Sequence, residues 1–60
     1  MSDVIKRMYR TAYSPLYQCY VSIVRCHQDV DGNWIFCCGN REQAIDDVLF
    51  RETELTNFCL

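Results

Sequence analysis

The strongest structural signal in the sequence is a turn motif, Asp29-Val30-Asp31-Gly32, between two runs of residues that favour β-strands. Asp is favoured at the first position of a type I turn, and Gly can adopt the left-handed conformation that a three-residue hairpin loop requires. Aromatic and β-branched residues are frequent in both flanking runs, at about 17–28 and 33–38. The sequence therefore predicts a β-hairpin.

The same turn sets the register of the hairpin and hence its two faces. A type I turn with a bulge places Cys26 opposite Phe36, and Gln28 then lies opposite Trp34. One predicted face carries Tyr20, Val24, Cys26, Trp34, Phe36 and Cys38, and the other carries Cys19, Val21, Ile23, Ile35 and Cys37. A two-residue turn would also leave both faces largely apolar. Because one helix cannot cover both, we expect the N-terminal segment or a second copy, as in a homodimer, to cover one of them.

A short amphipathic helix is predicted over residues 3–12, with Ser2 as its N-cap. Its apolar side chains recur at helical spacing: Val4, Ile5, Met8, Tyr9 and Ala12. Pro15 has no backbone N–H and disfavours the helical conformation in Ser14, so this helix should end near Tyr13.

A second helix is predicted over residues 41–54. Asn40, followed three residues later by Gln43, has the form of a capping box. The expected buried stripe consists of Ala44, Ile45, Val48, Leu49 and Leu55. Residues 52–60 contain no glycine or proline that would end the helix, and they could continue it or return as a third strand. The sequence as a whole predicts a single α+β domain over residues 1–60.

Five cysteines are an odd number for a disulfide framework, and the charged N-terminus does not have the pattern of an export signal or a membrane anchor. We therefore expect a chain in the cytoplasm of the host cell, with reduced thiols that act mainly as small apolar side chains.

One cluster has the residue types of a metal site: Cys26, His27, Cys37 and Cys38. Neighbouring residues on a strand point to opposite faces, so these side chains should not converge on one ion. His27 is the only histidine, and its neighbour Cys26 should point away from it, which disfavours cysteine catalysis. We therefore expect no cofactor and no enzymatic activity.

Two kinds of binding function remain. Tyr9, Tyr13, Tyr17 and Arg10 are of the residue types that dominate protein interfaces, which favours a protein-binding accessory or inhibitor protein acting on a host protein. The small size of the chain and its predicted hairpin-plus-helix arrangement are typical of accessory proteins that bacteriophages and prophages encode. The alternative is a small nucleic-acid-binding regulator that uses Lys6, Arg7 and Arg10. The net charge of −2 makes nucleic acid the less favoured partner.

Charge is distributed unevenly along the chain. Residues 1–25 contain four basic residues and one acidic residue, whereas residues 26–60 contain two basic and seven acidic residues. Such an asymmetry can orient a partner or a second copy of the chain.

Overall fold

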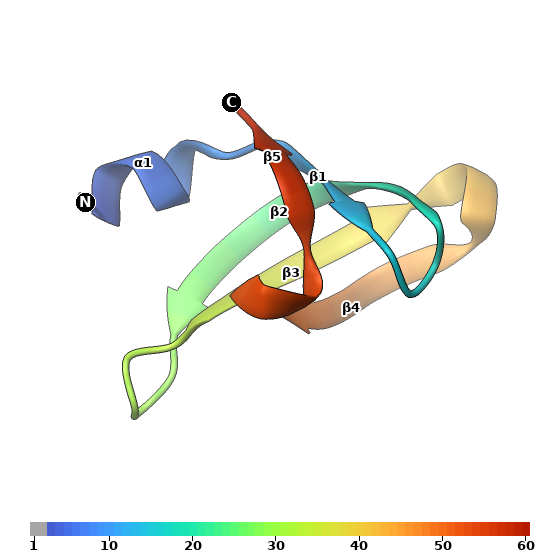
Figure 1. The fold of residues 1–60 in the computed structure, drawn as a ribbon. Helices are drawn as coiled ribbons and strands as arrows, with labels where there is room; N and C mark the ends of the chain where they lie inside the picture. Colours follow the sequence, from blue (N-terminus) through green and yellow to red (C-terminus); the bar gives the residue numbers. More distant parts are fainter. Residues whose placement is uncertain (1–2) are drawn as a thin grey trace.

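The computed structural model describes residues 3–60, which form a bent antiparallel sheet of five strands in the order β4-β3-β2-β1-β5 (Figure 1). The elements in chain order are α1 (Asp3–Met8), β1 (Thr11–Ser14), β2 (Cys19–Gln28), β3 (Trp34–Asn40), η1 (Arg41–Gln43), β4 (Ile45–Arg51), η2 (Glu52–Glu54) and β5 (Thr56–Cys59). The elements η1 and η2 are single turns of 3-10 helix on either side of β4. The chain is mostly β, and the predicted α+β fold with a C-terminal helix is wrong.

The turn between β2 and β3 has the chemistry predicted for it. The backbone N–H of Gly32 donates to the carbonyl oxygen of Asp29 at 3.0 Å, and Gly32 has a φ of 85°. The Asp29 Oδ1 atom accepts hydrogen bonds from the backbone N–H groups of Asp31 and Asn33, both at 2.9 Å. Local hydrogen bonds alone therefore account for this turn.

The hairpin starts in the predicted register but changes it further along. Cys26 lies opposite Phe36 as predicted, whereas Ile23 lies opposite Cys38 because Val24 is an extra, bulged residue in β2. The bulge moves the start of β2 to the opposite face. The core side of the hairpin consequently carries Cys19, Val21, Ile23, Cys26, Trp34, Phe36 and Cys38. The predicted face assignment was therefore wrong for Cys19, Tyr20, Val21, Ile23 and Val24.

Residues 41–54 do not form the predicted helix. The cap itself is present, since the Asn40 Oδ1 atom accepts a hydrogen bond from the backbone N–H of Gln43 at 3.2 Å. Only the single turn η1 follows, because Ala44 adopts a left-handed conformation with a φ of 56°. A right-handed helix cannot continue through that conformation, and the chain returns from Ile45 as strand β4.

Pairing with β3 explains why β4 replaces a helix. Phe50 lies directly opposite Phe36, and both side chains are buried. A bulge near Asp47, which has a φ of 50°, brings Ile45 to the core side together with Val48 and Phe50. A helix of this length is marginal in water by itself, whereas β4 extends an existing ladder and fills the core.

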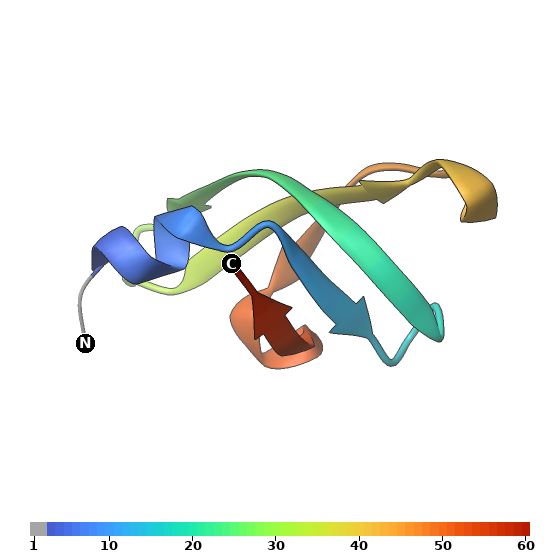
Figure 2. The same cartoon turned by 90° about the horizontal axis from the view of Figure 1, so that it is seen from above.

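The last residues form a strand, but not one that extends the hairpin. η2 redirects the chain after β4, and β5 pairs with β1, so that Thr11 lies opposite Cys59. Figure 2 shows β1 and β5 on one side of the long β2–β3 pair, with η2 joining β5 to β4. The sheet thus bends around a core formed by Ala12, Val21, Trp34, Phe36, Cys38, Ile45, Phe50 and Leu55.

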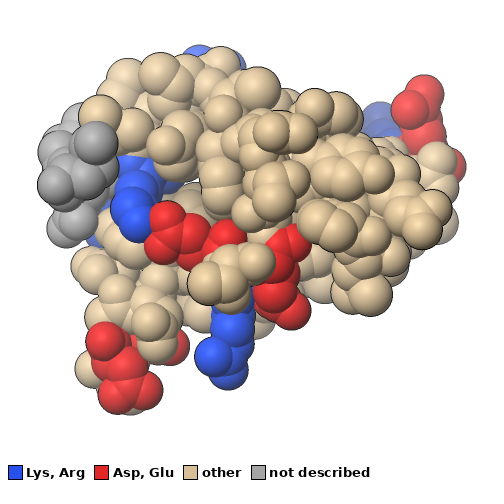
Figure 3. Space-filling model, in the orientation of Figure 1, with Lys and Arg blue, Asp and Glu red and all other residues tan. Residues whose placement is uncertain are grey.

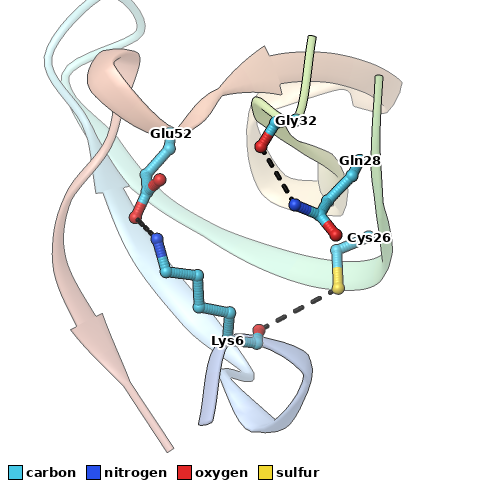
Figure 4. A network of polar contacts seen from close by, with 5 residues as sticks. All are labelled: Lys6, Cys26, Gln28, Gly32 and Glu52. Atoms are coloured by element: carbon cyan, nitrogen blue, oxygen red, sulfur yellow. Dashed lines mark hydrogen bonds and ion pairs between the residues drawn. The ribbon is translucent and has the colours of Figure 1, made fainter. Parts of the chain in front are cut away.

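The N-terminal helix is shorter than predicted. α1 ends at Met8. The last two residues of the predicted helix, Thr11 and Ala12, belong to strand β1, because this segment pairs with both β2 and β5. The predicted cap, Ser2, lies outside the described residues. α1 packs near the turn end of the β2–β3 hairpin, where the carbonyl oxygen of Lys6 accepts a weak hydrogen bond from the Cys26 thiol (3.9 Å; Figure 4). The helix therefore contacts the hairpin on its core side.

Candidate binding surfaces

The structure separates the tyrosines that the sequence analysis grouped together. Tyr9 is half-buried and packs against Phe58, with a ring centroid distance of 4.9 Å. Tyr13 lies on β1 and makes an edge-to-face contact with Tyr20 of β2, at 5.2 Å. Tyr17 lies in the β1–β2 turn, near Phe50. Tyr9 therefore belongs to the packing around the core, and the other two lie at the opposite end of the strands from Arg10.

The β1–β2 turn presents the clearest apolar surface. Leu16 is 74% exposed, Tyr17 42% and Tyr20 52%, and Tyr13 supports Tyr20 from the neighbouring strand. We call these four residues the aromatic surface. Figure 3 shows a broad uncharged area over this turn. Leu16 was not among the predicted site residues, although the sequence carries a signal for the surface: residues 11–24 contain no charged side chain.

The local sequence holds this turn in place. Pro15 fixes its own φ at the start of the turn, and the Ser14 hydroxyl accepts a hydrogen bond from the backbone N–H of Tyr17 at 3.2 Å. Gln18 closes the turn with a φ of 56°. Ser14 is completely buried, so the base of the turn is anchored in the protein. The aromatic surface therefore lies on a supported turn.

The predicted basic residues also divide into two groups. The Lys6 ammonium pairs with the Glu52 carboxylate at 2.5 Å, the one ion pair among the side chains that the structure describes (Figure 4). Arg7 lies over the Trp34 ring, with its Cζ atom 5.1 Å from the ring centroid. Arg10 is exposed, although its backbone is hydrogen-bonded to both β5 and β2. Glu52 therefore neutralises the charge of Lys6, which sets Lys6 apart from Arg7 and Arg10.

Arg7 and Arg10 line one open cleft together with Arg25, and we call it the arginine cleft. Its volume is about 590 Å³, and no Asp or Glu lines it. Apolar side chains, including Met8, Ile23 and Val24, supply other parts of the lining. Arg25 follows the Val24 bulge directly, so the bulge helps to place this guanidinium beside the α1–β1 segment. The cleft can attract an anionic group through its three positive charges.

The cysteines and His27 do not form a common centre. Cys37 and Cys38 are both buried, but they lie on opposite faces of β3, as neighbouring strand residues do. Burial, with a smaller effect from Cys37, raises the pKa of the Cys38 thiol to about 12, so this thiol stays protonated. His27 is exposed at the far end of β2. No group of three or more His, Cys, Asp or Glu within the described chain is arranged to hold a metal ion.

Comparison with known proteins adds no assignment: no family model matches the chain, and neither the curated proteins nor the solved structures contain a significant match. Among residues 3–60, no helix has the length and apolar character needed to cross a membrane.

Proposed function

We propose that this chain is a non-enzymatic protein-binding accessory or inhibitor protein, of the kind that bacteriophages and prophages encode, which modulates a host protein by occupying part of its surface. The observation that carries the proposal is the aromatic surface at the β1–β2 turn. Exposed apolar side chains are common singly, but Leu16, Tyr17 and Tyr20 are exposed within five positions of the chain, in a segment (residues 11–24) that carries no charged side chain, which is typical of an interface.

The support beneath these side chains favours tight binding. A tyrosine loses little rotational freedom on binding and contributes a large apolar area together with a hydroxyl group. The contact of Tyr20 with Tyr13 and the hydrogen-bonded turn before Tyr17 already restrict the conformations of this surface. Binding therefore costs less conformational entropy here than it would at a mobile loop. The expected partner surface is apolar and carries few charges.

Partner capture tests the proposal. Tagged protein is incubated with a bacterial lysate after nuclease treatment at about 0.15 M salt, where the range of charge interactions falls to about 8 Å. The captured partner is purified, and its affinity is measured for the wild type and two variants. We expect Leu16→Ala and Tyr20→Ala to weaken binding, with a loss of about thirtyfold at a hot spot.

Val30→Ala is the matched control, because Val30 is fully exposed in the β2–β3 turn, outside the aromatic surface. It should bind like the wild type. Thermal unfolding of each variant checks the fold, which matters most for Tyr20→Ala because this change also removes the contact with Tyr13. Equal affinities of all three variants and the wild type would contradict the proposal.

A small nucleic-acid-binding regulator is the second candidate, and the arginine cleft is the observation that favours it. The three arginines would contact phosphates, whereas Lys6 would contribute less because Glu52 already neutralises it. Titration of a labelled single-stranded oligonucleotide over a salt series tests this candidate. Arg10→Ala and Arg25→Ala should each reduce the slope of log affinity against log salt by about 1, with a smaller effect of Lys6→Ala. Binding that is independent of salt would exclude it.

A further inference from the structure

Two hollows of opposite charge lie side by side on the molecule, and Val24 lines both of them. One is the arginine cleft. The other has a volume of about 400 Å³ and is lined by Asp46 and Asp47, with Arg41 as its one basic residue. We call this second one the acidic hollow. Because Val24 forms part of both walls, the change from positive to negative surface occurs at this bulged residue.

Two apolar side chains near this boundary are exposed to solvent. Val24 is 62% exposed, and Leu49 is 59% exposed on the outer face of the sheet, in line with Arg25 and Cys37 on the adjoining strands. α1 contacts the sheet on its core face, at Cys26 and Trp34. α1 therefore does not cover the outer face of the sheet.

We propose that a second copy of this chain covers the outer face in a two-fold symmetric dimer centred near Val24. A two-fold interface brings the same patch of both copies together, so the patch must complement itself. Because Val24 lines both hollows, a two-fold axis at Val24 would bring the arginine cleft of each copy to the acidic hollow of the other. A patch with adjacent hollows of opposite charge meets the requirement for self-complementarity.

The expected contacts combine an apolar centre with charge pairs at its two sides. Val24 and Leu49 would lose their contact with water at the centre. Guanidinium groups bind carboxylates well because two parallel N–H donors can match two oxygens, and each pair between Arg25 and Asp46 would occur twice by symmetry. The overall charge of −2 per copy opposes association, but salt screens that long-range repulsion more than it screens contacting pairs.

Sedimentation equilibrium of the purified protein over a concentration series tests this proposal without any other partner. We expect the wild type to form dimers and Arg25→Asp to weaken dimerisation at least about tenfold, because both symmetric pairs become repulsive. Asp46→Arg should have the same effect. Asp46 is preferred to Asp47 for this change, since Asp47 has a positive φ and its carboxylate lies 3.9 Å from the Cys37 thiol.

The decisive measurement is a mixture of the two charge-reversed variants. In a dimer of one Arg25→Asp copy and one Asp46→Arg copy, every pair again joins opposite charges, so the mixture should dimerise although each variant alone does not. Asp31→Arg in the distant β2–β3 turn is the control and should leave dimerisation unchanged. Circular dichroism confirms the fold of each variant.

Two results would overturn the proposal. One is a wild type that stays monomeric up to about 1 mM, which corresponds to an association free energy weaker than about −4 kcal/mol. The other is a mixture of the two variants that remains as weakly associated as its components. Neither result bears on the aromatic surface, because Leu16, Tyr17 and Tyr20 line neither hollow.

Discussion

Lys6 and Glu52 form an ion pair between Nζ and Oε2 at 2.5 Å, across 46 positions of the sequence. The contact joins α1 to the turn η2. It therefore connects two elements that lie outside the sheet. It also neutralises one of the three basic residues of the predicted nucleic-acid site, Lys6, Arg7 and Arg10.

A double-mutant cycle with Lys6→Ala and Glu52→Ala measures this contact. Both side chains are partly exposed, so solvent screens the attraction, and we expect a coupling free energy below about 1 kcal/mol. The coupling should decrease further as salt is added. Urea unfolding of the four proteins gives the value. A coupling of several kcal/mol would show that the pair is far less accessible to solvent than the structure indicates.

Substitutions at Leu49 and Phe50 distinguish strand β4 from the predicted helix. Phe50 is buried in the core, so Phe50→Ala should lower the free energy of unfolding by about 3–5 kcal/mol. A domain of this size has about that much stability in total, so most molecules of the variant should be unfolded. Leu49→Ala should change the free energy of unfolding by no more than about 0.5 kcal/mol in dilute protein, where the chain is monomeric. A buried helical stripe would make Leu49 the sensitive position instead. Chemical denaturation of the two variants decides between them.

Ala44→Gly should stabilise the protein, by up to about 1 kcal/mol, because Ala44 has a φ of 56° and glycine adopts this conformation without steric cost. In the interior of a helix the same substitution would destabilise the protein by about 1 kcal/mol. The sign of the change in melting temperature is therefore sufficient as a readout. Gln43→Gly, at a position within η1, serves as the control and should be destabilising.

The stability of the β2–β3 turn should depend on pH through Asp29. The backbone N–H of Asn33 lowers the pKa of this carboxyl below its ordinary value of 3.8, with a further contribution from the N–H of Asp31. A lowered pKa in the folded protein stabilises it above pH 3.8, and this contribution disappears as the pH falls through the lowered pKa.

The difference in unfolding free energy between wild type and Asp29→Ala should therefore shrink as the pH falls from about 5 through the lowered pKa of Asp29. Asp31→Ala, which removes a carboxylate from the same turn but leaves its backbone N–H in place, is the matched control and should show a smaller pH dependence. A constant difference for Asp29→Ala would mean that its carboxylate does not hold the turn.

Features that depend only on neighbouring residues could be predicted from the sequence. The β2–β3 turn follows from Asp29 and Gly32, and the cap before η1 follows from Asn40 and Gln43, because in each case the hydrogen-bonding groups lie within four residues of one another. The turn and the cap were correctly placed. The end of the N-terminal helix was not, because α1 ends at Met8 and the following residues pair as β1 with β2 and β5.

Where a segment could form either a helix or a strand, contacts with distant segments determined which one formed. The segment Ile45–Arg51 has apolar spacing that suits a helix, yet it forms β4 because Phe50 can pair with Phe36 across the open edge of β3. The Val24 bulge could not be predicted from the sequence of β2, because an extra residue is defined only by the pairing of β2 with β3. It nevertheless turns Val24 outward and places Arg25 in the arginine cleft. The candidate sites therefore depend on strand pairing between distant segments, which gains its free energy only when the whole sheet forms around its core.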